Sequence, residues 1–278
     1  MKTMLNKIAA TSVLAVFSLP FVAHASDSQY VPGLEGIKGS VLPPPGVYYR
    51  GYLANYSADK NEALPNGGEV DVTALVNRAV WVTPQKFLGA DVVLDTIVPL
   101  VKTDIEINGI AKDDRTGLGN LYASGLLGWH GERWDAIAGA GWYFGNSGDY
   151  SINRIASPAK DYDSLSFTLG GNVKLNKAGD IDFSALGTYE IPQEDGLDEE
   201  LMIEWGLSKS FGMLDVGLVG YNTFETGAGD EKRNAIGVST AYFSPNLLLG
   251  GDVGVYKEYS NENTFEGSLI RASLTKAF

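Results

Sequence analysis

Residues 164–175 read Ser-Leu-Ser-Phe-Thr-Leu-Gly-Gly-Asn-Val-Lys-Leu, a stretch in which apolar residues alternate with polar or small ones. Successive side chains of a β-strand point to opposite faces, so a period of two residues predicts a strand with one apolar face. That face carries Leu165, Phe167, Leu169, Gly171, Val173 and Leu175. The alternation is much longer than the strands of about five or six residues that are usual in soluble sheets.

The same period recurs along the chain, and no segment shows a convincing helical period. Residues 180–192 alternate with one exception, Leu186, and residues 199–211 and 247–258 follow the same rule. We expect about twelve strands, an even number, at 46–57, 69–82, 87–100, 117–130, 133–144, 162–175, 180–192, 199–211, 213–225, 234–243, 247–258 and 265–278.

The connections between these strands alternate between long and short. The long ones lie near 58–68, 101–116, 145–161, 193–198, 226–233 and 259–264. The short ones lie at Thr83-Pro84-Gln85-Lys86, around Gly131, at Asn176-Lys177-Ala178-Gly179, at Gly212 and at Ser244-Pro245-Asn246. Long outer loops and tight periplasmic turns are typical of outer-membrane barrels, whose strands cross about 25 Å of hydrocarbon. A secreted β-sandwich is the alternative, but it has no reason to sort its loops in this way.

We therefore predict an all-β protein, a transmembrane antiparallel β-barrel of about twelve strands in the bacterial outer membrane. Trp134 and Trp142 lie on one face of the expected strand at 133–144, where an aromatic girdle would lie. The chain ends in Phe278, and an aromatic last residue on an alternating strand resembles the signal read by the barrel-assembly machinery. The expected partners are thus outer-membrane lipid and that machinery.

The composition excludes several classes of function. The 278 residues include no cysteine, so disulfides, thiol catalysis, iron–sulfur clusters and thiolate zinc sites are excluded. Lys and Arg number 21 and Asp and Glu number 34, which gives a formal net charge of −13. A nucleic-acid partner is not expected, because phosphate contacts need clustered basic residues.

The chain divides into three parts. Residues 1–25 are predicted to be a signal peptide, with Lys2 and Lys7 before an apolar stretch and Ala23-His24-Ala25 as the cleavage pattern. Residues 26–45 form a non-strand segment that ends in three prolines, which cannot donate the hydrogen bonds of a barrel wall. This segment is either a periplasmic tail or a plug in the lumen. Residues 46–278 form the predicted barrel.

The polar face of the expected strands predicts the lining of the lumen. The candidate lining residues are Tyr48, Arg50, Tyr52, Tyr56, Asp91, Asp95, Arg133, Asp135, Asp182, Glu204, Asp252 and Arg271. A lining with charges of both signs suits either a wet channel or a structural salt-bridge core. Both alternatives stay open, because twelve strands fall between packed eight-stranded barrels and open porins.

The sequence offers little for catalysis. His130 is the one histidine outside the predicted signal peptide, and a membrane-embedded lipase of the Ser-His type would need it as its base. Its place beside a short turn favours a structural role. No phosphate-binding, dinucleotide-binding or His-Glu metal motif occurs, so we predict no enzyme, no cofactor and no metal site. The acidic clusters 113–114, 194–195 and 198–200 are expected to be solvated surface.

Five stretches carry a resemblance to known proteins: Tyr30-Val31-Pro32-Gly33-Leu34-Glu35-Gly36-Ile37, Leu42-Pro43-Pro44-Pro45-Gly46-Val47-Tyr48-Tyr49, Gly117-Leu118-Gly119-Asn120-Leu121-Tyr122, Leu127-Gly128-Trp129-His130 and the run 134–150. These stretches resemble a bacterial family described as phenol-degradation meta-pathway proteins, whose members look like outer-membrane transporters. The resemblance implies a channel for the passive passage of small, hydrophobic or aromatic compounds. A lipid-modifying enzyme and a structural barrel without transport are the alternatives.

Overall fold

The computed structural model describes residues 27–64, 66–226 and 230–278, so the predicted signal peptide lies outside the described residues. The structure is all-β. No helix in these ranges is long and apolar enough to cross a membrane. The strands are β1 (Gly46–Lys60), β2 (Gly68–Phe87), β3 (Ala90–Ile107), β4 (Ala111–Leu118), β5 (Leu121–His130), β6 (Trp134–Phe144), β7 (Ser164–Lys174), β8 (Ile181–Pro192), β9 (Glu200–Phe211), β10 (Leu214–Glu225), β11 (Lys232–Ser244), β12 (Leu249–Glu258) and β13 (Glu266–Ala277).

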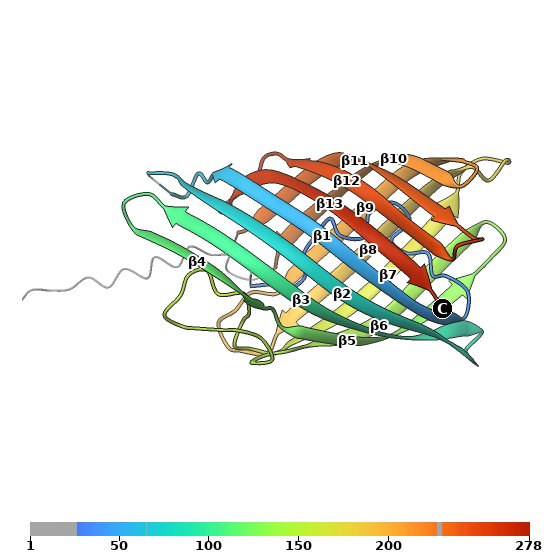
Figure 1. Ribbon diagram of the computed structural model, residues 1–278, viewed down its shortest axis with the longest axis horizontal. Helices are drawn as coiled ribbons and strands as arrows, with labels where there is room; N and C mark the ends of the chain where they lie inside the picture. Colours follow the sequence, from blue (N-terminus) through green and yellow to red (C-terminus); the bar gives the residue numbers. More distant parts are fainter. Residues whose placement is uncertain (1–26, 65, 227–229) are drawn as a thin grey trace, which may run out of the picture.

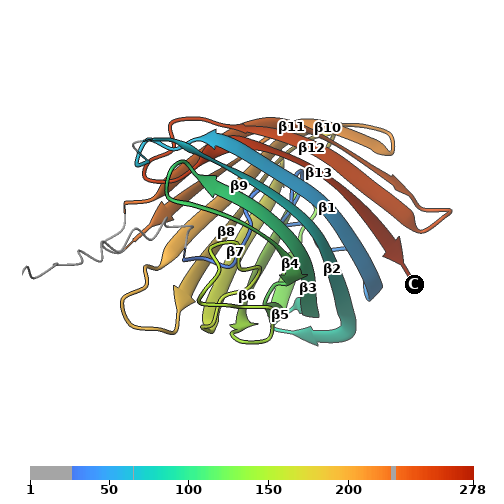
Figure 2. The ribbon, with the colours of Figure 1, turned by 60° about the vertical axis from the view of Figure 1, so that its left-hand side comes forward.

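The strands form one closed antiparallel barrel, in which they run obliquely to the long axis (Figures 1 and 2). β1 pairs with β2 and β13, neighbours in sequence pair from β5 to β13, and β2 pairs with β3 to complete the ring. β3 also pairs with both β4 and β5, which make one strand of the wall interrupted at Gly119 and Asn120. The wall therefore has twelve strands, which confirms the predicted fold.

The two faces of the wall differ as the alternation predicts. In β13, Ile270 has 57% of its surface exposed, whereas its neighbour Arg271 has 1%. In β1, Leu53 is 56% exposed and Tyr52 is 2% exposed. The exposed apolar side chains cover the outside of a barrel whose polar residues are buried inside, which is the arrangement that a lipid bilayer requires. The chain is therefore an outer-membrane barrel.

The turn predicted at residues 83–86 is wrong. β2 continues to Phe87, and the turn consists of Leu88 and Gly89, whose φ angles are 50° and 78°. The register with β3 shifts between Val82 and Lys86. Pro84 lies within this irregularity, where a residue that cannot donate a ladder hydrogen bond is tolerated.

The long loop predicted at residues 101–116 is also wrong for most of its length. β3 runs to Ile107 and β4 begins at Ala111, so only a tight turn of three residues separates them. The paired positions are largely polar; Glu106 lies opposite Lys112, and their side chains form an ion pair of 2.5 Å. Residues 101–107 continue the alternation of β3, but the polar run 112–116 gives β4 no apolar face, which is why the hairpin resembled a loop in sequence.

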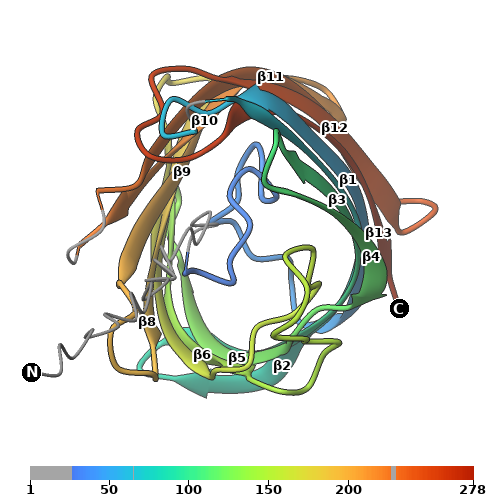
Figure 3. The ribbon, with the colours of Figure 1, turned by 90° about the vertical axis from the view of Figure 1, so that its left-hand side faces the viewer.

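Residues 27–45 form no strand and lie inside the ring of strands (Figure 3). At one end, the Tyr162 hydroxyl of the loop after β6 donates to the Asp27 carbonyl at 2.5 Å. At the other end, Leu42 packs against a buried cluster of Val82, Val93 and Leu126 near the short turns. We call residues 27–45 the lumen segment. It crosses the barrel interior from the long-loop end to the short-turn end, where β1 begins.

We expect the purified protein to be heat-modifiable. A closed barrel satisfies the backbone hydrogen bonds of every strand, so it should resist detergent until it is heated. The unboiled sample should migrate faster than the boiled one in gel electrophoresis, and a boiled sample that has been cooled slowly in detergent is the control for refolding. Identical migration of unboiled and boiled protein, with full solubility in detergent-free buffer, would contradict the barrel.

Candidate functional site

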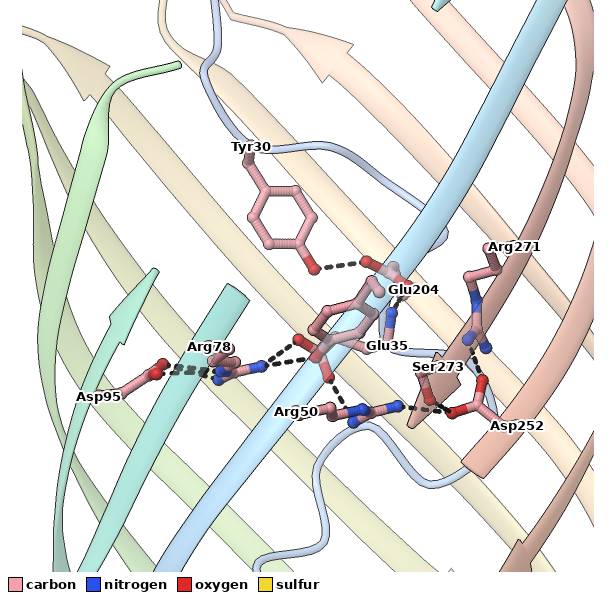
Figure 4. Close-up of polar contacts among 10 residues, drawn as sticks. Tyr30, Glu35, Arg50, Arg78, Asp95, Glu204, Asp252, Arg271 and Ser273 are labelled. Atoms are coloured by element: carbon pink, nitrogen blue, oxygen red, sulfur yellow. Dashed lines mark hydrogen bonds and ion pairs between the residues drawn. The ribbon is translucent and has the colours of Figure 1, made fainter. Parts of the chain in front are cut away.

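Two arginines on adjacent strands form the central ion pairs of the barrel interior. Arg50 of β1 lies directly opposite Arg78 of β2, and both point into the lumen (Figure 4). Like charges at opposite positions of a sheet repel each other. Here the carboxylate of Glu35, from the lumen segment, lies between them. Its Oε1 is 2.5 Å from Nη1 of Arg78 and its Oε2 is 3.5 Å from Nη1 of Arg50.

Carboxylates of the wall occupy the outer sides of the two arginines. Arg78 donates from Nε and Nη2 to Asp95 of β3, at 3.0 Å and 2.7 Å. Arg50 donates from Nη2 to Asp252 of β12 at 2.8 Å. Arg271 of β13 donates to the other oxygen of the same carboxylate. Three carboxylates and three guanidinium groups thus alternate across the interior, and one of the carboxylates belongs to the lumen segment.

Charge balance keeps Glu35 ionised in this buried place. Each of its two oxygens contacts a guanidinium group, so the buried negative charge is paired on both sides. The two arginines therefore favour the ionised form of the carboxyl. Its hydrogen bonds to the arginines are charge-assisted, the class of hydrogen bond that is roughly twice as strong as a neutral one.

Glu204 of β9 holds the lumen segment from the opposite side of the barrel. One oxygen accepts from the hydroxyl of Tyr30, and the other accepts from the backbone N–H of Glu35 at 3.2 Å. The Tyr30 hydroxyl is the donor in this contact, because an ionised carboxylate oxygen can only accept. The Tyr30 ring and the Glu35 carboxylate therefore lie in fixed positions relative to the wall (Figure 4).

A lysine and a serine fix the later part of the lumen segment. Lys38 Nζ lies 3.0 Å from Oδ2 of Asp215 in β10 and 3.4 Å from Oδ2 of Asp182 in β8. The hydroxyls of Ser40 and Ser184 are 2.7 Å apart, and both residues are buried. These contacts join the segment to strands that are far from Arg50 and Arg78 around the barrel.

The first residues of the lumen segment bind one buried carboxylate, that of Glu190 in β8. The Ser28 hydroxyl donates to Oε2 at 2.7 Å, and the backbone N–H of Gln29 donates to Oε1 at 2.8 Å. The side-chain carbonyl of Gln29 accepts from Asn120, at the interruption between β4 and β5, at 2.6 Å. The interruption thus places a polar side chain against the segment.

Glycines give the lumen segment room against the wall. Gly36 has a φ of 67°, and an added Cβ would lie 1.8 Å from Nη2 of Arg271. On the wall, a Cβ at Gly128 of β5 would lie 2.2 Å from Cδ1 of Leu42, and one at Gly170 of β7 would lie 2.8 Å from Cβ of Ser40. The close approach of segment and wall therefore depends on glycine on both sides.

The other predicted lining residues lie nearer the ends of the barrel or in smaller contacts. Tyr48 donates its hydroxyl to the Pro44 carbonyl at 2.6 Å, and Tyr56 donates to Glu258 at 2.7 Å. Asp135 contacts His130 and Asn172. Arg133 does not lie on an inward strand face, because β6 begins only at Trp134; it is in the preceding turn and donates to the carbonyls of Lys174 and Asn176.

The residues that the sequence analysis missed include Arg78 and Glu35, which make the central contact. In residues 75–82, apolar side chains occur at both odd and even positions. The alternation therefore did not show which face of this strand points into the lumen. One signal was available: Arg50 and Arg78 both lie near the middle of their strands, where a lipid-facing charge would be costly. Glu35 carries no comparable signal, since its segment has no periodic structure.

His130 is held by carboxylates. Its Nδ1 lies 2.8 Å from Asp135 and its Nε2 lies 3.4 Å from Asp91, which also forms an ion pair with Lys86. In the part of the chain that the structure describes, no serine hydroxyl forms a hydrogen bond with this ring. The same ranges contain no group of three or more His, Asp or Glu side chains arranged to hold a metal ion.

Comparison with known proteins identifies the family. The model of the family described as "Putative MetA-pathway of phenol degradation" matches residues 54–274, which is most of the chain. The chain belongs to this family, as its sequence motifs indicated. No curated protein matches the sequence.

Solved structures show the same fold at low sequence identity. An outer membrane channel from Pseudomonas putida F1 is 12% identical, with a TM-score of 0.74, over 90% of this chain and 100% of that one. The translocator domain of the autotransporter NalP from Neisseria meningitidis is 10% identical, with a TM-score of 0.53, over 86% and 91%. The transport unit of the autotransporter AIDA-I from Escherichia coli is 12% identical, with a TM-score of 0.51, over 84% and 90%. These similarities establish the barrel fold alone.

Proposed function

We propose that the protein is an outer-membrane channel for the passive passage of small, hydrophobic or aromatic molecules, and that the lumen segment is its displaceable plug. The observation that carries the proposal is the place of the lumen segment inside the barrel. Residues 27–45 contact the wall through side chains and backbone N–H groups and add no strand to it. A segment held in this way can leave without breaking the barrel.

The polar contacts of the segment support reversible closure. Ionic contacts through Glu35 and Lys38 and a hydrogen bond through Ser40 hold it, and each wall partner belongs to a strand that is already paired on both sides. Water that enters the lumen can replace these contacts. The net cost of release is therefore much smaller than the cost of unfolding a strand.

Two features support apolar or aromatic passengers. Tyrosine side chains line the interior at Tyr52, Tyr122, Tyr143, Tyr221 and Tyr256, all of them buried. Rings of this kind present both an apolar face and a hydroxyl to a passenger. The description of the family refers to phenol degradation. The Pseudomonas putida F1 structure that shares the fold is an outer membrane channel.

The surroundings of His130 support a channel over a lipid-modifying enzyme. Both ring nitrogens face carboxylates, so the ring serves as a bridge between Asp91 and Asp135. A nucleophilic serine would need one of these nitrogens. The partners we propose are a small-molecule passenger, outer-membrane lipid around the wall and the barrel-assembly machinery.

Conductance in planar lipid bilayers tests the proposal. The purified full chain should produce discrete current steps, and liposomes that contain it should release a small aromatic solute faster than empty liposomes do. Boiled protein is the control for the folded barrel. A folded, heat-modifiable protein that gives neither steps nor release would be a structural barrel. Hydrolysis of lipid by the full chain that is lost in His130→Ala would instead establish the enzyme.

A further inference from the structure

We infer that the lumen contains a binding site for a small carboxylate with an apolar body, a site that Glu35 and Leu34 of the lumen segment occupy in this structure. The inference rests on the proposed function, since the ligand must enter the channel. It assigns a ligand class to Arg50, Arg78 and the apolar wall beside them.

The two arginines leave one anion position between them. Each oxygen of Glu35 contacts one guanidinium group, at 2.5 Å for Arg78 and 3.5 Å for Arg50. The outer sides are already filled by Asp95 and Asp252. When Glu35 leaves, the wall alone keeps Arg50 opposite Arg78, so their repulsion returns unless another anion enters. The planar forks of arginine suit a carboxylate in that place.

Charge also favours an anion once the segment is displaced. Arg50, Arg78 and Arg271 then face the two carboxylates of Asp95 and Asp252. Glu204 lies at the opposite side of the site, where it accepts from the backbone N–H of Glu35 and the hydroxyl of Tyr30. With Glu204 the wall holds three guanidinium groups and three carboxylates. The charged wall groups that contact the Glu35 carboxylate are Arg50 and Arg78, and this local positive charge attracts an anion when Glu35 leaves.

The wall also holds more hydrogen-bond donors than Glu35 uses. Within residues 27–64, 66–226 and 230–278, Nε of Arg50 and both Nε and Nη2 of Arg271 are buried without a hydrogen-bond partner. Arg271 is 1% exposed, and its Nη2 lies beside Gly36 of the lumen segment. Buried donors without partners are costly. A free carboxylate, unlike that of Glu35, is not tethered to the backbone of the lumen segment and can turn toward these donors.

The apolar part of the ligand is indicated by the residue next to Glu35. Leu34 and Ile37 pack against a buried cluster formed by Ala54, Val219, Tyr221, Ala235, Tyr256 and Leu269. A leucine side chain and a carboxylate from adjacent residues thus occupy an apolar wall and an arginine pair at the same time. A small molecule with both groups would fill the same two places, and its binding would displace the segment.

Titration calorimetry with benzoate on the full chain in detergent micelles tests the inference. Benzamide, which lacks the charge, and acetate, which lacks the apolar body, are the control compounds. We expect benzoate to bind more tightly than either. Glu35→Gln should raise its affinity by at least about tenfold, because the ligand no longer competes with the internal carboxylate. Arg50→Gln should lower its affinity by about tenfold through loss of a charge-assisted contact.

Arg50→Gln is the preferred variant because Asp252 keeps Arg271 as a partner, and its heat-modifiable migration verifies folding. Arg133→Gln is the matched control, since Arg133 donates to turn carbonyls and should leave the affinity unchanged. Benzamide or acetate binding as tightly as benzoate, or Glu35→Gln without effect, would overturn the inference. Conductance steps without benzoate binding would contradict the carboxylate site and would still support the proposed channel function. Benzoate binding without conductance would contradict the proposed channel function and would still support the carboxylate site.

Discussion

Oxidation of the double variant Ser40→Cys/Ser184→Cys should close the channel, and reduction should reopen it. The two hydroxyl oxygens are 2.7 Å apart, and both residues are buried. Two cysteines in these places bring their sulfur atoms close to the distance of about 2.05 Å that a disulfide needs. Ser40 belongs to the lumen segment and Ser184 to β8, so the bond would fix the segment to the wall.

The sequence makes this experiment unambiguous because the chain has no other cysteine. Planar-bilayer recordings should show current steps for the reduced double variant and a loss of most of them after oxidation. The single variants Ser40→Cys and Ser184→Cys, oxidised in the same way, should conduct like the native protein. If the double variant is fully cross-linked by mass spectrometry and still conducts, solute passes beside the segment, and the segment is no plug.

The fold could be predicted from sequence because lipid and lumen impose opposite demands on alternate residues. Ile270 and Arg271 are neighbours in β13, yet one is 57% and the other 1% exposed. The prediction failed where this contrast is absent. Residues 112–116 are polar on both faces, so β4 gave no signal there, although Val101, Ile105 and Ile107 alternate with charged residues in β3.

The candidate site was only partly predictable. The alternation of their strands predicted an inward position for Arg50, Asp95, Asp252 and Arg271. Arg78 was missed because it lies in a stretch with apolar residues on both faces. Glu35 could not be placed at all, because the conformation of a segment without periodicity depends on tertiary contacts. Recognising the arginine pair and its internal carboxylate therefore requires both the register between β1 and β2 and the position of the lumen segment.

Deleting residues 30–42 should raise the single-channel conductance several-fold without preventing assembly of the barrel. The deletion removes the ionic contacts of Glu35 and Lys38 and the Ser40 hydroxyl, together with Leu34 and Ile37 from the apolar cluster. No backbone pairing of the wall includes these residues. The twelve-stranded ring therefore remains complete, and water fills the space that the segment leaves.

A point variant gives the same test with less change to the chain. In Gly36→Ala, the new Cβ would lie 1.8 Å from Nη2 of the buried Arg271, and the φ of 67° would add strain of about 1–2 kcal/mol. Its conductance should rise in the same direction as in the deletion, although less. Gly196→Ala is the matched control, because its φ is 89° and an added Cβ would have no atom within 4 Å. If the deletion variant is heat-modifiable and its conductance is unchanged, the segment does not restrict flow, and the long loops must control the channel instead.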